Sequence, residues 1–82
     1  MKLITLLDLN LLRYNAIIYD QVKFSAGLFE LEIVCHLTRN YGIITKEKLV
    51  EANLSLNYFE REVVEIWGEG INKLGIVLKG EK

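Results

Sequence analysis

The sequence contains no proline and, among 82 residues, a single cysteine (Cys35) and a single histidine (His36). One cysteine excludes a disulfide within the chain, and a small domain without disulfides is typical of a reducing compartment. Because Cys35 follows the apolar pair Ile33 and Val34, we expect a small buried side chain and not a reactive thiol. These features together predict a cytoplasmic protein.

Long apolar runs are also missing. No stretch approaches the roughly 20 apolar residues of a transmembrane helix, and Asp8 interrupts the apolar start too early for a secretory signal. Linkers, internal repeats and low-complexity segments are absent from the sequence. Hydrophobic residues make up 51% of the chain, which is enough to form a core. We therefore expect one folded domain over residues 1–82.

The chain has no excess of basic residues. Ten Lys and Arg stand against eleven Asp and Glu, so the net charge is −1. Domains that bind nucleic acid are usually basic, and the net charge therefore predicts no general attraction to DNA.

Residue patterns that would support catalysis are missing as well. His36 and its helical neighbour Glu32 provide too few ligands for a metal site. Gly68 and Gly70 follow no expected strand, which excludes a dinucleotide-binding loop. We expect a binding protein without metal or cofactor, and not an enzyme.

The order of elements follows from the apolar spacing. Residues 1–25 are strand-rich, with a hairpin expected from residues 16–19 and 22–24. Residues 26–41 predict a first helix, because apolar side chains recur at about 100° per residue and Gly42 follows as a cap.

Two further helices and a strand are expected in the second half. Thr45 can cap a second helix over residues 45–53, and Asn57 with Glu60 forms a capping-box pattern at the start of a third helix over residues 57–74. A short strand over residues 76–79 follows. The expected core on these helices contains Leu31, Val34, Leu37, Leu49, Phe59, Val63, Ile66 and Leu74.

One stretch resembles a known family, the effector domains of OmpR/PhoB-type response regulators. The matching residues are Glu30-Leu31-x-Ile33-Val34-x-x-Leu37-x-x-Asn40-x-Gly42-x-Ile44-Thr45-Lys46-Glu47-x-Leu49-x-Glu51. The segments Val64-x-Ile66 and Asn72-Lys73-Leu74-Gly75 are similar to the end of that family's recognition helix. The resemblance implies an α+β winged helix-turn-helix with an N-terminal antiparallel sheet, three helices and a short C-terminal strand.

Two departures from the family pattern concern the DNA-binding parts. The recognition helix would carry Glu62, Glu65 and Glu69 on its outer face against the single basic residue Arg61. The C-terminal wing would be shortened.

The resemblance implies a transcriptional regulator that binds double-stranded DNA. The expected contact residues are Arg39, Lys46, Lys48, Arg61, Asn72 and Lys79. The alternative is a protein-interaction module that docks a partner through the acidic third helix. Because the N-terminal sheet has an edge, a homodimer is also expected.

Overall fold

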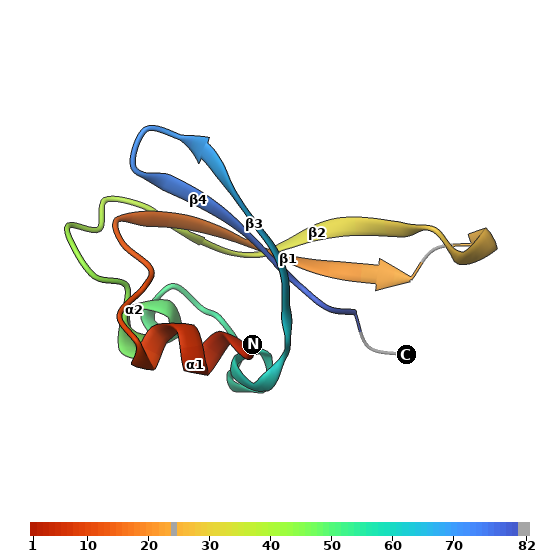
Figure 1. The fold of residues 1–82 in the computed structure, drawn as a ribbon, viewed down its shortest axis with the longest axis horizontal. Coiled ribbons are helices and arrows are strands. Elements are labelled where there is room, and N and C mark those ends of the chain that lie inside the picture. The colour runs from red at the N-terminus through yellow and green to blue at the C-terminus, as the bar shows by residue number, and fades with distance from the viewer. Residues whose placement is uncertain (24, 81–82) are drawn as a thin grey trace.

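A computed structural model of the chain describes residues 1–23 and 25–80. Helical and extended segments alternate along these residues (Figure 1). Their order is α1 (Leu3–Asp8), β1 (Asn15–Lys23), the 3-10 turn η1 (Ser25–Gly27), β2 (Phe29–Leu37), α2 (Lys46–Glu51), the 3-10 helix η2 (Leu56–Glu60), β3 (Val63–Gly70) and β4 (Lys73–Leu78).

Within the described residues, four strands form one mixed sheet in the order β2-β1-β4-β3. The strands β1 and β2 make one antiparallel hairpin, and β3 and β4 make the other. The two hairpins join through β1 and β4, which run parallel and pair Ile18 with Ile76 at the centre of the sheet. The central strands β1 and β4 contain fully buried residues such as Ile18, Ile76 and Leu78, because each of these strands has a strand on both sides.

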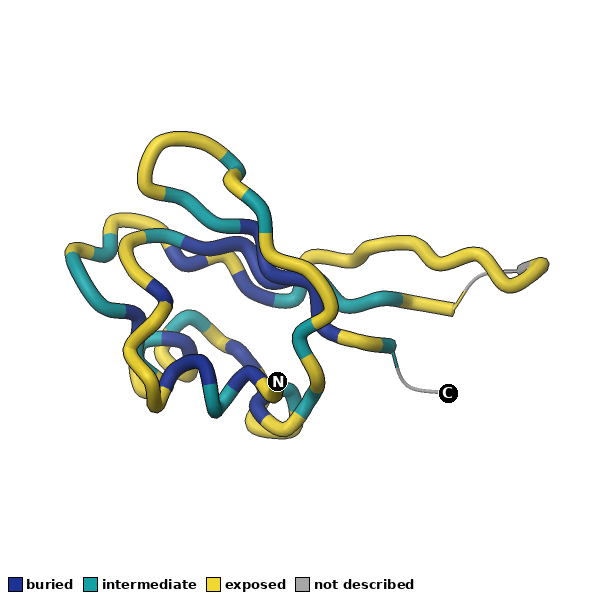
Figure 2. Tube along the Cα trace, viewed as in Figure 1, coloured by how far each residue is buried: buried dark blue, intermediate teal, exposed yellow. Residues whose placement is uncertain are grey.

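The helices cover one face of this sheet, below it in Figure 1. Side chains from both layers form one core, whose fully buried members include Leu3, Leu12, Ile18, Ile44, Leu49, Ile76 and Leu78. In Figure 2 the buried positions concentrate on the central strands and on the helical segments beneath them. Beyond the helices the β1–β2 hairpin continues as a projecting arm of mostly exposed residues (Figures 1 and 2).

Two of the expected local features are present. The second helix forms at Lys46–Glu51, and the Thr45 hydroxyl accepts a hydrogen bond from the Lys48 amide as the expected N-cap. Cys35 is buried, and burial raises the pKa of its thiol. Its Sγ lies 3.6 Å from the carbonyl oxygen of Ala52, which packs α2 against β2.

The expected winged-helix fold is wrong. Residues 26–41 contain the strand β2 (Phe29–Leu37) and not a first helix. Residues 57–74 form η2, β3 and the start of β4, and not a recognition helix. The strand-rich start is partly wrong as well, because residues 3–8 are helical and residues 15–23 form one strand. Phe24, at the end of the expected hairpin, lies outside the described residues.

Local sequence explains these corrections. In β2 the apolar Phe29, Leu31 and Ile33 alternate with Glu30 and Glu32, which is the period of a strand. The third helix fails because the β-branched start of β3 and its glycines disfavour a helix. Asn57 is not a cap: it lies inside η2, which begins after Ser55.

The expected core is therefore only partly correct. Leu37, Leu49 and Phe59 are buried, and Val34, Val63 and Leu74 pack against the core from its margin. Leu31 and Ile66 are 48% and 43% exposed, because the helical layer does not reach them.

A second, smaller cluster lies on the face of the sheet that the helices leave open. The rings of Tyr19 and Trp67 stack with their centres 5.3 Å apart. The Tyr19 hydroxyl and Trp67 Nε1 both donate to Oε1 of Glu69, over 2.6 and 2.8 Å. This hydrogen bond raises the pKa of Tyr19, and it fixes both rings over Gly75, which pairs with Trp67 across the sheet.

Replacing Gly75 with alanine is expected to destabilise the fold by about 1–3 kcal/mol, the usual cost of overpacking. A Cβ atom at this position would lie 2.6 Å from Cε2 of Trp67 and 2.9 Å from Oε1 of Glu69, so both side chains must shift. Urea unfolding followed by Trp67 fluorescence measures the loss. The matched control is Gly68→Ala, where a Cβ atom meets nothing within 4 Å. Equal losses in the two variants would contradict this account.

Candidate nucleic-acid interface

Three connecting segments meet at the end of the molecule opposite the arm. They are residues 9–15, from the end of α1 to the first residue of β1, residues 38–45 between β2 and α2, and residues 70–73 at the β3–β4 turn (Figure 1). We call their combined outer side the three-loop surface. Because α1, β1, β2 and α2 are all anchored in the core, the loops start and end at fixed positions.

Hydrogen bonds tie the three loops to one another. The Tyr14 amide donates to the carbonyl of Gly42 over 2.6 Å, and the Asn15 amide donates to the carbonyl of Asn72 over 3.0 Å. Asn40 connects the first two loops twice more: its amide donates to Asn15 Oδ1, and its Nδ2 donates to the carbonyl of Tyr14. The three-loop surface is thus held as one unit by bonds between loops far apart in sequence.

The composition of this surface differs from that of the whole chain. The three loops contain Arg13, Arg39 and Lys73 and no Asp or Glu. A fourth cation, Lys48, extends from α2 and donates from Nζ to the carbonyl of Ile43 over 2.9 Å. A chain with a net charge of −1 therefore places four basic side chains around loops that carry no carboxylate.

Large side chains stand exposed among these cations. Tyr41 is 88% exposed, and Ile71 at the tip of the β3–β4 turn is 93% exposed. Tyr14 is also exposed. Interleaved cations and exposed aromatic rings can contact both the phosphates and the bases of a nucleic acid.

The backbone of the three-loop surface adopts an uncommon conformation at several positions. Tyr14, Arg39 and Asn72 have φ values of 66°, 56° and 56°, in the left-handed region. Asparagine tolerates this region, but tyrosine and arginine enter it at a cost of order 1 kcal/mol. Strained residues of this kind cluster at functional sites.

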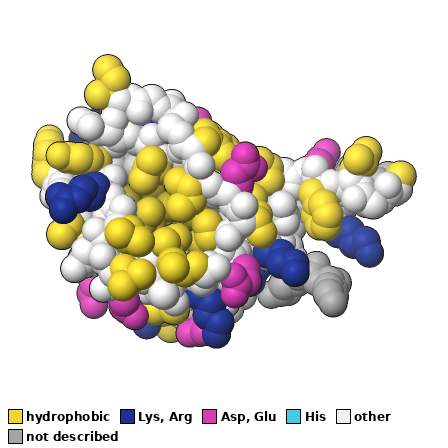
Figure 3. All heavy atoms as spheres, viewed as in Figure 1, with side chains coloured by type: hydrophobic (Ala, Val, Ile, Leu, Met, Phe, Trp, Pro, Cys, Tyr) yellow, Lys and Arg dark blue, Asp and Glu magenta, His cyan; other side chains and the backbone are white. Residues whose placement is uncertain are grey.

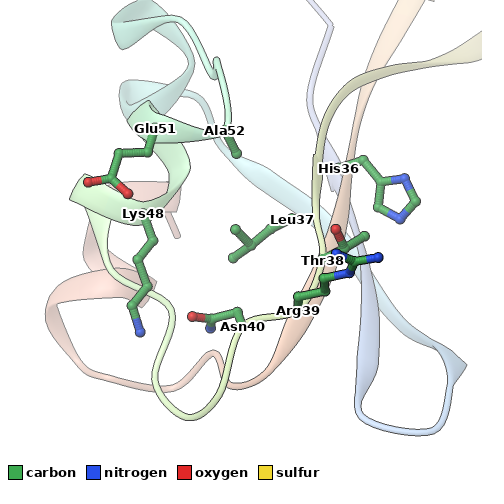
Figure 4. Close-up of a pocket in the computed structure, with 8 residues that line it drawn as sticks. All are labelled: His36, Leu37, Thr38, Arg39, Asn40, Lys48, Glu51 and Ala52. Atoms are coloured by element: carbon green, nitrogen blue, oxygen red, sulfur yellow. The ribbon is translucent and has the colours of Figure 1, made fainter.

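Several hollows border this surface. One of about 390 Å³ lies between α2 and the end of β2 (Figure 4). Lys48 and Asn40 extend along it, whereas Arg39 and His36 point to the other side of the β2 ribbon. A second, of about 230 Å³, is lined in part by Arg13 and Lys73. A third, of about 280 Å³, is lined in part by Asn10 and Thr45 of the loops and by the acidic residues Asp8 and Glu47.

The carboxylate of Glu51 also lines the hollow of about 390 Å³, and Asn40 Nδ2 already donates to the carbonyls of Tyr14 and Gly42. The donor left for an anion there is the Lys48 ammonium group.

The residues expected from the sequence to contact DNA separate into two groups. Arg39, Lys48 and Asn72 lie on or beside the three-loop surface. Lys46 lies over the ring of Phe59, beside the helices.

Arg61 and Lys79 lie together on the other half of the molecule. The Arg61 guanidinium pairs with Asp20, and its Nε donates to the carbonyl of Lys79. The structure therefore does not bring all the expected contact residues together.

Four residues of the three-loop surface were missed by the sequence reasoning, namely Arg13, Tyr14, Tyr41 and Lys73. A signal for them exists, because each lies within a few residues of an asparagine in a loop without carboxylates. What brings the loops together is the pairing of strands distant in sequence, and local patterns do not contain that information.

Charged side chains of both signs lie on the rest of the molecule. In the view of Figure 3 acidic and basic side chains are mixed along the lower side and the arm, and a basic side chain lies among hydrophobic ones at the end with the three loops. Hydrophobic side chains also gather at the centre of this view, over the gap between sheet and helices. Basic side chains are not confined to this end, since Arg61 and Lys79 lie together on the other half of the molecule.

Comparisons with protein-family models, curated proteins and solved structures find no match to this chain. In residues 1–23 and 25–80, none of the helices has the length and apolar character needed to cross a lipid bilayer. The same residues hold no group of three or more His, Cys, Asp or Glu side chains placed to bind a metal ion.

Proposed function

We propose that this protein binds DNA in the cytoplasm through the three-loop surface, in a role in transcriptional control. The observation that carries the proposal is the clustering of Arg13, Arg39, Lys48 and Lys73 around three interlinked loops that lack carboxylates. Phosphate contacts supply most of the affinity in non-specific DNA binding. Local charge at the contact surface therefore decides binding, even when the net charge is −1.

The mode of binding differs from the one that the family resemblance implied. The expected recognition helix does not form, because residues 57–74 form η2, β3 and the start of β4. Loops without a protruding helix reach phosphates more easily than base edges in the major groove. We therefore propose that binding depends weakly on DNA sequence.

The exposed ring of Tyr41 adds a preference among forms of DNA. A base stacked on an aromatic side chain contributes about 1–3 kcal/mol in single-stranded complexes. Stacked bases inside a duplex are not accessible to such a ring. Tyr41→Ala is thus expected to weaken single-strand binding by about that amount and to change duplex binding little.

Fluorescence anisotropy with labelled random duplex DNA at low salt tests the proposal. Arg39→Ala and Lys73→Ala are each expected to weaken binding and to lower the log–log salt slope by about one, since each removes one phosphate contact. Lys79→Ala is the control, because Lys79 lies outside the three-loop surface. No binding at low salt, or equal losses with Lys79→Ala, would refute the proposal.

A further inference from the structure

The arm consists of residues 19–23 of β1 and residues 29–33 of β2 (Figures 1 and 2). Residues 29–33 are all exposed, because the contact of β2 with the helical layer begins near Cys35. Among the described residues, β2 has β1 as its only strand neighbour. The outer side of β2 therefore presents unpaired backbone N–H and C=O groups, which can pair with another strand.

The two faces of β2 in the arm carry different side chains, and one face is apolar. Leu31 and Ile33 pair with Gln21 and Tyr19, and so lie on the open face of the sheet that also holds Trp67. Phe29 continues the same row. Three apolar side chains, each about half exposed, thus form a stripe along the open face of the arm.

The opposite face of the same strand is acidic. Glu30 and Glu32 point to the side of Asp20, which pairs with Glu32 across the hairpin. The Arg61 guanidinium compensates Asp20. Within the described part of the chain, no basic side chain forms an ion pair with Glu30 or Glu32.

These charges make a second copy of this chain a poor partner for the edge. In an antiparallel β2–β2 pair, Glu30 and Glu32 would face the same carboxylates of the other copy, and like charges directly opposite are destabilising. The second free edge, β3, contains Glu65 and Glu69 and no basic residue. Neither β2 nor β3 of a second copy can therefore provide basic side chains to pair with Glu30 and Glu32.

We propose that the arm binds an extended segment of a partner protein, in which basic and apolar residues alternate, as an additional strand beside β2. The backbone of the segment pairs with the free edge. Its apolar side chains extend the stripe of Phe29, Leu31 and Ile33, and its basic side chains meet Glu30 and Glu32. The carboxylates that prevent self-association thereby select the partner.

The test uses the whole chain and a labelled ten-residue peptide of alternating valine and lysine. We expect binding by anisotropy, with a peptide of the same composition in scrambled order binding roughly tenfold more weakly, because it cannot place all its valines on one face. Hydrogen exchange is expected to slow at the outward-facing amides among residues 29–33 and not in β3.

Two double variants with the same change of charge sharpen the result. Glu30→Lys with Glu32→Lys is expected to weaken peptide binding roughly tenfold, whereas Glu47→Lys with Glu65→Lys leaves it nearly unchanged. Trp67 fluorescence and circular dichroism check that both variants are folded. Equal binding of the scrambled peptide, equal losses in the two variants, or protection of β3 would each overturn the proposal. Sedimentation of the free chain as a dimer that Leu31→Ser with Ile33→Ser dissociates would also overturn it, by assigning the edge to a second copy.

Discussion

A fourfold increase in salt concentration is expected to weaken the binding of duplex DNA by roughly 150-fold. Four cations around the three-loop surface, Arg13, Arg39, Lys48 and Lys73, can each neutralise one phosphate. Each neutralised phosphate contributes about −0.9 to the log–log slope for duplex DNA, so four give about −3.6. Anisotropy titrations at 50 and 200 mM salt measure the ratio.

The reversed-charge variant Arg39→Glu with Lys73→Glu provides the control for this prediction. It is expected to leave no measurable salt-dependent binding, because it replaces half of the attraction with repulsion. A slope shallower than about −1.5 for the unaltered chain would contradict contact by four cations. A steep slope that persists in the variant would show that DNA binds elsewhere.

Leu49→Ala is expected to cost about 2–5 kcal/mol in the free energy of unfolding, the usual range for a buried leucine. Leu49 on α2 is 0% exposed, and Leu31 on β2 is 48% exposed. Leu31→Ala removes the same atoms from an open site and is expected to cost less than about 1 kcal/mol. Because both variants replace leucine with alanine, the difference between their free energies of unfolding in urea reports the difference in burial.

This comparison also separates the two folds. A helix over residues 26–41 would bury Leu31 in the core, and its loss would then match the loss at Leu49. Similar losses in the two variants would contradict the sheet described above.

Part of the fold could be predicted from the sequence. Thr45 identifies α2, and the apolar neighbours of Cys35 predict its burial, because both depend on residues close in the chain. Over residues 28–35 the apolar side chains fit both a helical period and a strand period. The alternation of Glu30 and Glu32 with apolar residues is the pattern that indicates the strand. In residues 57–74 the capping pattern of Asn57 and Glu60 outweighed the β-branched residues and glycines that follow.

The candidate site was harder to predict than the fold. Arg39, Lys48 and Asn72 were expected from the sequence as contact residues and do lie on or beside the three-loop surface, but the sequence placed them on a helix-turn-helix frame. Their actual neighbours, Arg13 and Lys73, come from loops 60 residues apart in the chain. Only the parallel pairing of β1 with β4 brings those loops together, and no local pattern specifies a pairing over that distance.

The parallel pairing at the centre of the sheet also has a consequence for how the chain folds. Each hairpin closes between segments close in sequence, whereas Asn15 meets Lys73 only after most of the chain is available. Contacts of large sequence separation slow folding, because the entropy of closing the intervening loop is lost before they form. The two hairpins should therefore form early and dock late. During synthesis, the edge of β1 that pairs with β4 therefore stays unpaired until β4 has left the ribosome.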